Sequence, residues 1–354
     1  MEVIVSGAWA NLAPAVVWVG LMLVGGVALW LARVHSRIVV LLGAMPVAVL
    51  TVTLVGFVQI VAPIKFTWVT VALAAWVVGL LVGSVRRMLA RLRVLEPSVT
   101  PPGEGLSPVA DPWLVTALLL ALSAGLAGLV MWSAGGGRWD VASQTWDAFF
   151  DANVIRAAAD SQVLNPTLTS DFAYRVPIGS YYPSTFHGVG VLVIQATGCN
   201  AVVASNVVAG LVAGGLWPAT AALSARYVLG QGAVIPALVL AWGFHGMPWA
   251  PLGWGVLWAT GVAGAAVPLV IATFAGMCGL TRVPRARLLG AMGFLASMVA
   301  LAALHPRIAF LLGALLLLPW LWVVLGNSRR DWTAGRHGRA GVLAMLALAP
   351  LAGL

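Results

Sequence analysis

Hydrophobic segments of about 20 residues recur along the chain, separated by short breaks that carry arginine or proline. Each segment is long enough to cross a bilayer as a helix, whereas the strands of a membrane barrel would show short alternating patterns. The pattern therefore predicts an all-α polytopic membrane protein. The expected spans are residues 13–32, 38–58, 66–84, 113–132, 200–224, 231–246, 254–277, 288–304 and 308–325, with a tenth starting near residue 340.

The basic residues orient these spans. If the spans alternate, most of the chain's 19 Lys and Arg residues fall on one face. They are Arg33, Arg37, Arg86, Arg87, Arg91, Arg93, Arg226, Arg282, Arg285, Arg287, Arg329, Arg330, Arg336 and Arg339. Lys and Arg are retained on the cytoplasmic side of membranes, so we expect this face to be cytoplasmic.

The segment 185–197, TFHGVGVLVIQAT, is hydrophobic enough to be taken for a further span. Counting it as a span would place the arginine clusters after residue 281 outside the cell, against the distribution of charge that membranes favour. We therefore expect a helix that lies at the outer surface without crossing. Residues 133–199 then form one extracytoplasmic region.

Composition supports a membrane protein, since 61% of the residues are hydrophobic, only 8% are charged and the mean hydropathy is +1.00. The net charge of +9 does not indicate nucleic acid, because the arginines punctuate helices and do not alternate with aromatic residues on one surface. We expect a multi-pass protein of the plasma membrane with the bilayer as a partner. Residues 1–112 form an N-terminal segment of three helices and a Pro- and Gly-rich linker, and residues 113–354 form a second module.

The outer region holds half of the chain's ten acidic residues, Asp140, Asp147, Asp151, Asp160 and Asp171. The hydrophobic segments on either side contain almost none, so this region is the candidate seat of chemistry. A helix capped by Thr145 and ending before Pro166 is predicted within it. At helical spacing, Asp147 and Asp151 share one face beside an aromatic stripe.

Two carboxylates one turn apart suit two kinds of chemistry. Together they bind a divalent cation such as Mg²⁺ or Mn²⁺ with phosphate oxygens, or one acts as a general base whose pKa the other raises. The alternative is a solvated face of an interfacial helix. From the residues alone these interpretations stay open.

Other candidate binding residues lie on the same side of the membrane. Arg175, Tyr182 and His187 follow in the outer region, where tyrosines are also typical of the aromatic belt. His305 and Arg307 lie in the turn between two later spans. Because basic residues are disfavoured on this face, Arg307 indicates contact with a lipid headgroup or with the phosphate of a lipid carrier.

The order of four motifs resembles a known group of proteins. TWDAFFDANVIRAAADSQ, SYYPSTFHGVGVLV, ASNVVAGLVAGGLWPATAALSARYVLG and ALHPRIAF follow one another as in large actinobacterial membrane proteins with a domain of unknown function, assigned to the GT-C glycosyltransferase superfamily. The resemblance covers roughly residues 113–325. It implies a GT-C-like helical bundle whose large first outer loop carries amphipathic interfacial helices.

The resemblance also implies an activity and roles for residues. A sugar would pass from a polyprenyl-phosphate donor to a glycan or lipid acceptor of the cell envelope, outside the membrane. Asp147 matches the catalytic acidic residue of the loop, whereas the family often has His at the position of Asp151. His187 and the turn 305–307 match substrate or phosphate contacts. Members of this group are longer, so the chain is expected to be truncated at its C-terminus.

Two other classes of function remain as alternatives. A transporter or flippase for lipid-linked sugars would use the outer acids as a gate or ion site, but it predicts broken helices and ionisable residues near the bilayer midplane. The expected spans contain almost no such residues. A non-catalytic membrane scaffold is favoured if Asp147 and Asp151 point away from any cavity.

Overall fold

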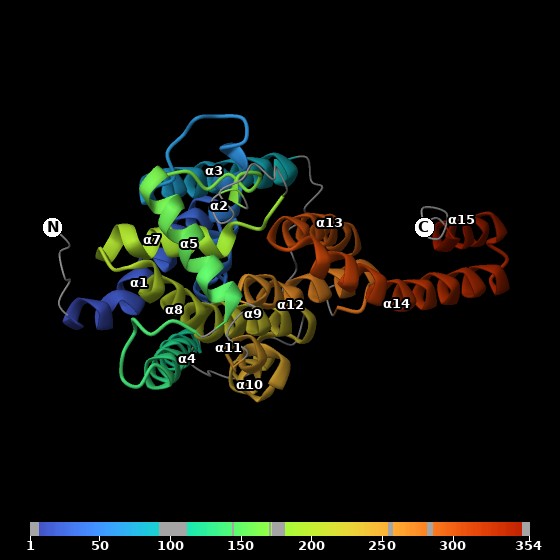
Figure 1. The fold of residues 1–354 in the computed structure, drawn as a ribbon. Helices are drawn as coiled ribbons and strands as arrows, with labels where there is room; N and C mark the ends of the chain where they lie inside the picture. Colours follow the sequence, from blue (N-terminus) through green and yellow to red (C-terminus); the bar gives the residue numbers. More distant parts are fainter. Residues whose placement is uncertain are drawn as a thin grey trace.

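The computed structural model describes residues 7–91, 112–143, 145–169, 171, 181–253, 258–281 and 286–348. This part of the chain consists of helices and connecting turns and contains no β-strand (Figure 1). The long helices are α1 (Gly7–Leu31), α2 (Arg37–Val58), α3 (Trp68–Arg91), α4 (Trp113–Ala134), α5 (Trp146–Ser161), α7 (Thr185–Thr197), α8 (Ala201–Leu211), α9 (Trp217–Leu229), α12 (Trp258–Cys278), α13 (Ala286–Leu304), α14 (Pro306–Thr333) and α15 (His337–Leu348). Shorter elements are η1 (Val212–Leu216), η2 (Gln231–Ala233), α10 (Val234–Leu240), η3 (Ala241–Gly243), η4 (His245–Trp249) and α11 (Ala250–Gly253).

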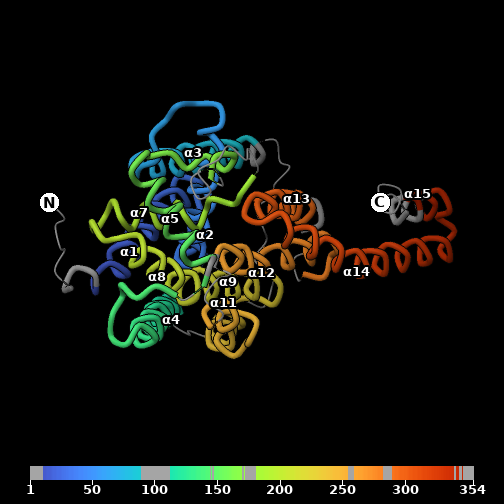
Figure 2. Tube along the Cα trace, in the orientation of Figure 1, coloured from blue at the N-terminus to red at the C-terminus, as the bar shows by residue number. Residues whose placement is uncertain are grey.

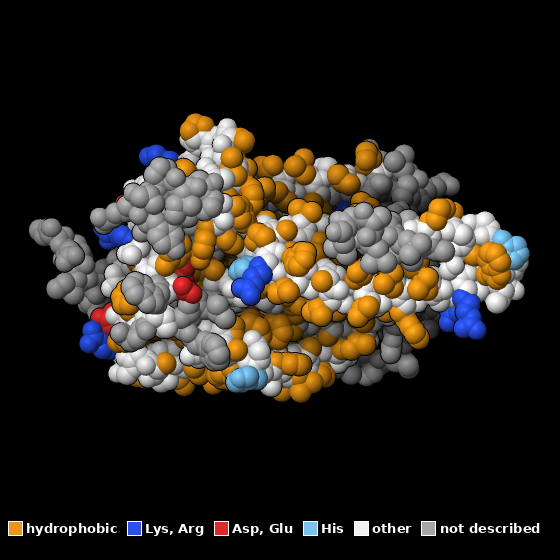
Figure 3. Space-filling model, turned by 45° about the vertical axis from the view of Figure 1, so that its right-hand side comes forward, with side chains coloured by type: hydrophobic (Ala, Val, Ile, Leu, Met, Phe, Trp, Pro, Cys, Tyr) orange, Lys and Arg blue, Asp and Glu red, His pale blue; other side chains and the backbone are white. Residues whose placement is uncertain are grey.

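The expectation of an all-α polytopic membrane protein is confirmed. Seven described helical segments are long and apolar enough to cross a membrane, and an eighth arises if the bent pair Gln231–Gly253 is one span. Their outward faces are hydrophobic, as Figure 3 shows for one side of the molecule, and on α14 the side chain of Trp322 is 83% exposed. Such surfaces are stable against lipid and not against water.

Close helix contacts hold the bundle together. A Cβ at Gly25 of α1 would lie 1.8 Å from the carbonyl oxygen of Ala44 in α2, so only glycine permits this approach. The α4 helix runs antiparallel to α8 and η1, with Gly210 opposite Met131 and Gly214 opposite Ala127. The pair α14 and α15 extends away from the body of the molecule (Figure 1).

Two predicted spans differ from simple helices. The span predicted over 200–224 contains a π-helical turn at η1 between α8 and α9. The span predicted over 231–246 is broken, because the segment up to Gly243 and the segment from His245 to Gly253 meet at a bend of 52°. Phe244 and Met247 have extended backbone angles, and Met247 precedes a proline, which disfavours the helical conformation there.

The helix at 185–197 is confirmed as α7, and its contacts support a helix that does not cross the membrane. Near its start, the hydroxyl groups of Thr185 and of Thr53 in α2 are 2.7 Å apart. Near its end, the indole of Trp68 in α3 donates to the carbonyl of Leu192 over 2.8 Å. Both ends of α7 therefore lie at the end of the bundle where α2 passes into α3, which we call the loop side.

We expect positions on both sides of α7 to be accessible from one side of the membrane. In a variant without Cys199 and Cys278, cysteines introduced at the exposed residues Ser161 and Ala196 should both react with a membrane-impermeant maleimide in intact cells. A cysteine at the exposed Arg87, at the other end of α3, is the control and should react only after permeabilisation. Opposite labelling of positions 161 and 196 would show that α7 crosses.

Candidate functional site

The helix α5, which carries the predicted acidic residues, is fixed at its C-terminal end. The chain leaves the helix at Gln162, whose backbone is left-handed with a φ of 56°. The side chain of Gln59 at the end of α2 donates to the carbonyl of Gln162 over 3.1 Å and accepts from the amide of Leu164 over 2.6 Å. The amide of Phe66 also donates to the carbonyl of Gln162 over 2.8 Å. These bonds hold α5 against the turn between α2 and α3.

The segment that leads from α4 to α5, whose course Figure 2 shows, is hydrogen-bonded to the bundle as well. The side chain of Asn206, buried in α8, donates to the carbonyls of Trp139 and Val141 over 2.7 and 3.0 Å. Beside it, Arg138 and Asp140 form a bidentate ion pair with distances of 2.9 and 2.7 Å. A polar side chain inside a membrane helix is costly without partners, so this contact fixes where the segment lies.

A buried hydrogen bond joins α5 to α7. The Oδ1 atom of Asp151 lies 2.8 Å from Nε2 of His187, and the side chains are 2% and 0% exposed. Asp151 lies on the buried face of α5 together with Val154, Ile155 and Ala158. Asp147, one turn earlier, is exposed. The two carboxylates that the sequence places on one face are therefore in different environments.

Burial raises the pKa of the carboxyl group of this pair. Loss of solvation raises the pKa of Asp151, the neighbouring charge of Asp147 raises it further, and the hydrogen bond from His187 opposes the rise. Nδ1 of His187 is buried without a hydrogen-bond partner among the described residues. The pair is thus enclosed on all sides, with one polar atom of the imidazole left without a partner in the described part of the chain.

Aromatic rings enclose His187. The ring centroids of Phe150, Tyr182 and Phe186 lie 6.1, 5.8 and 5.7 Å from that of the imidazole, and Phe150 lies 4.8 Å from Tyr182. Tyr182 is half-buried, so one part of this ring faces the surface. The enclosure keeps water away from the Asp151–His187 pair.

Tyr181 connects this cluster to the later turn. Its hydroxyl donates to the carbonyl of Ala303 in α13, two residues before His305, and its burial raises its pKa to about 12. Because Tyr181 and Tyr182 are adjacent, the dipeptide bridges the surroundings of His187 and the turn that contains Arg307. On the face drawn in Figure 3, acidic, histidine and basic side chains lie in one band between hydrophobic areas.

The turn itself carries a neutral and a charged group. Nε2 of His305 lies 3.2 Å from the hydroxyl of Thr260 in α12, and burial, with the positive charge of Arg307, lowers the pKa of His305. Arg307 is exposed, and no carboxylate in the described ranges lies within ion-pair distance of it. Arg138 and Arg156, by contrast, are paired with Asp140 and Asp160.

The structure thus joins some predicted site residues and separates others. Asp151, His187 and Tyr182 form one cluster, and His305 and Arg307 lie at the other end of the tyrosine bridge. Asp147 is exposed one turn before Asp151, and Arg175 lies outside the described residues. The sequence analysis missed Thr260, which lies 45 residues from its partner His305. No local pattern marks such a contact.

The arrangement limits how a divalent cation would be held. Asp147 offers an exposed carboxylate, but Asp151 is hydrogen-bonded to His187. Within the described part of the chain, no three His, Cys, Asp or Glu side chains form a group that could hold a metal. A Mg²⁺ or Mn²⁺ ion at Asp147 would therefore take most of its ligands from water and from substrate phosphate, which is usual for Mg²⁺.

A family model with the description "Family of unknown function (DUF6541)" matches residues 19–354. The chain belongs to the DUF6541 family. Comparison with curated proteins and with solved structures gave no match. The DUF6541 match includes the acidic residues of α5, the α7 helix with His187 and the turn with Arg307, so these features lie within the family's own region.

The buried pair predicts a dependence of stability on pH. Since the pKa of Asp151 is raised in the folded protein, its contribution to stability is complete below the unfolded pKa and is lost as pH rises through the folded pKa. In detergent, the melting temperature of the wild type minus that of Asp151→Asn should fall as pH rises from about 4, the unfolded value. Asp160→Asn, which removes an exposed carboxylate of the same helix, is the control and should not show this fall. A flat curve for Asp151→Asn would contradict the burial effect.

Proposed function

We propose that the protein is a membrane glycosyltransferase that transfers a sugar from a polyprenyl-phosphate donor to an acceptor of the cell envelope. The observation that carries this proposal is the tyrosine bridge, which connects the helix of the exposed Asp147 to the turn of the exposed Arg307. A carboxylate base and a cation for the phosphate are the two groups that such a transfer requires. The motif order that resembles GT-C glycosyltransferases supports the same reaction.

In the proposed reaction, Asp147 accepts the proton of an acceptor hydroxyl group. The hydroxyl oxygen attacks the anomeric carbon, and the bond between that carbon and the phosphate oxygen breaks. The oxygen leaves with the electron pair as part of the polyprenyl phosphate. Direct displacement of this kind inverts the anomeric centre.

Arg307 binds the phosphate of the donor and stabilises the charge that develops on it as it leaves, because its guanidinium is exposed and has no carboxylate partner in the described part of the chain. His305, whose pKa is lowered, contributes a hydrogen bond and no charge. Asp151 and His187 are buried between α5 and α7, so their role is to hold α5 in position. We place the site outside the cell, since most basic residues lie at the opposite end of the spans.

A flippase for lipid-linked sugars is the second candidate. The observation that favours it is the broken helical segment Gln231–Gly253, because interrupted membrane helices are typical of transporters. This candidate predicts movement of the lipid without formation of a new glycosidic bond. The assay below separates the two.

Asp147→Asn should lower sugar transfer by about 10²–10⁴-fold, since it removes the base that accepts the hydroxyl proton. Transfer would be measured in membranes with a panel of radiolabelled polyprenyl-phosphate sugars. Asp160→Asn is the matched control, as an exposed carboxylate on the same helix, and should keep full activity. Full transfer activity in Asp147→Asn would contradict the role of Asp147 as the general base. Flipping of the labelled lipid without transfer by the wild type would favour the flippase.

Arg307→Gln should raise the KM for the polyprenyl-phosphate sugar at least about tenfold, because hydrogen bonds to charged groups contribute about 1.5–3 kcal/mol. Arg307→Lys should restore part of the affinity by returning the charge without the planar fork. Arg156→Gln, which removes a paired surface arginine, is the control. An unchanged KM in Arg307→Gln would remove this residue from the donor site.

A further inference from the structure

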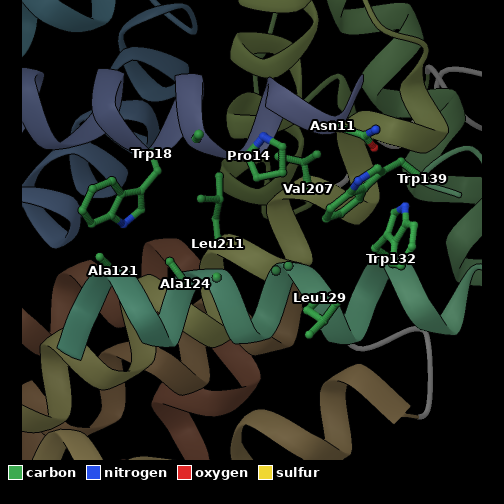
Figure 4. Close-up of a pocket in the computed structure, with 14 residues that line it drawn as sticks. Asn11, Pro14, Trp18, Ala121, Ala124, Leu129, Trp132, Trp139, Val207 and Leu211 are labelled. Carbon is green, nitrogen blue, oxygen red and sulfur yellow. The ribbon is translucent and has the colours of Figure 1, made fainter. Parts of the chain in front are cut away.

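A long hydrophobic groove runs between α1 and α4 over a floor formed by α8 (Figure 4). Its volume is about 560 Å³. The residues of α4 that line it recur at helical spacing and are mostly small, and they include Ala121, Ala124, Gly125 and Gly128. Asn11, Pro14, Ala15 and Trp18 form the facing stripe on α1. The groove is therefore built along the axes of two membrane-spanning helices.

The small residues of α4 make the hollow. A Cβ added to Gly125 would meet no atom within 4 Å, and one added to Gly128 would meet only a ring atom of Trp139, at 3.9 Å. Ala15, Ala121 and Gly125 are exposed in the isolated chain, and Leu129 at the rim is 55% exposed. The groove thus opens sideways, towards the hydrocarbon of the bilayer.

The two ends of the groove differ in polarity. Asn11, Trp132 and Trp139 lie together at one end, and Trp18 lies at the other (Figure 4). The first group is at the loop side, where α1 begins and α4 ends. Tryptophan is enriched at the level of the lipid headgroups because its ring is hydrophobic and its N–H group donates a hydrogen bond. The groove therefore has the shape of an amphipathic ligand, with a polar end at the membrane surface and a hydrophobic interior.

Small residues at this spacing also occur where membrane helices meet. The volume of the groove, about 560 Å³, falls within the range of about 300–1,000 Å³ of pockets for small ligands. The groove therefore has the size of a site for one small amphipathic ligand.

We propose that the groove between α1 and α4 binds one acyl chain of a bilayer phospholipid, with the headgroup beside Asn11, Trp132 and Trp139. Bulk phospholipid is the occupant because the groove is open to the bilayer along its length and needs no carrier to fill it. The bound acyl chain stiffens the packing of α4 against α1. Since Asn206 ties the segment after α4 to α8, the lipid also steadies the connection to α5. This site does not rest on the proposed transfer reaction.

Gly125→Leu tests the proposal, because a leucine there fills the groove without meeting another atom at its Cβ. Purified protein would be incubated with a phospholipid that carries a diazirine in one acyl chain, illuminated, and mapped for labelled peptides of α1, α4 and α8. We expect labelling of these peptides to fall at least fivefold in Gly125→Leu. Gly326→Leu is the matched control, since Gly326 in α14 is a helical glycine with equally open surroundings, and it should label as the wild type.

A second readout keeps the test independent of one variant. Added phospholipid should raise the melting temperature of the wild type in detergent and of Gly326→Leu, and should raise that of Gly125→Leu less. Ala121→Leu, which fills the same groove, should behave as Gly125→Leu. Two results would overturn the proposal. One is equal labelling of the wild type and of the variants that fill the groove, Gly125→Leu and Ala121→Leu. The other is displacement of the label by an equimolar polyprenyl phosphate, which would indicate that the groove binds a prenyl chain. Asp147→Asn should be labelled as the wild type is. Loss of lipid labelling and loss of sugar transfer are therefore separate results, and each tests only its own proposal.

Discussion

The hydrogen bond between Asp151 and His187 determines how the loop side of the molecule is arranged. A carboxylate beneath a helix and an imidazole without solvent are each unfavourable alone, and the loss of one partner from a buried pair is strongly destabilising. The contact therefore fixes the rotation of α5 about its axis and its position on α7. The exposure of Asp147 follows from it. Residues four apart usually share a face, but here the boundary between the buried and the exposed surface runs between them.

The bilayer imposes the second constraint, because polar groups within it must find partners in the protein. Asn206 in α8 and Gln59 at the end of α2 both meet this need with backbone groups of residues 133–199. One amide holds the segment before α5 and the other holds the segment after it. The region 133–199 is thus held on the bundle at both ends. A site on such a support is more precisely positioned than one on a free loop.

The sequence was sufficient for the features that depend on local patterns. Segment length and hydropathy predicted most of the candidate spans, but the span expected over 288–304 corresponds to a shorter apolar helix, Leu289–Leu304. The distribution of arginines predicts that α7 does not cross. The pairing of Asp151 with His187 could not be predicted, because the two residues are 36 positions apart and the helical register alone placed Asp151 beside Asp147. The bend near Phe244 was missed because the span over 231–246 was predicted from hydropathy and length alone. Its signal was Pro248, which restricts the backbone of Met247.

Charge balance at the loop side singles out two residues. Arg138 and Arg156 are each neutralised by a nearby carboxylate. Arg307 has no such partner within the described ranges, and it lies in the first turn of α14, where the helix dipole is already positive. Asp147 in the first turn of α5 has no described cation within ion-pair distance. A cation is unfavourable at a helix N-terminus unless an anion approaches it, so the electrostatics of Arg307 fit a phosphate. The electrostatics of Asp147 do not by themselves indicate a ligand, because its negative carboxylate already complements the positive N-terminal end of the α5 dipole. A ligand at Asp147 is required only by the proposed reaction.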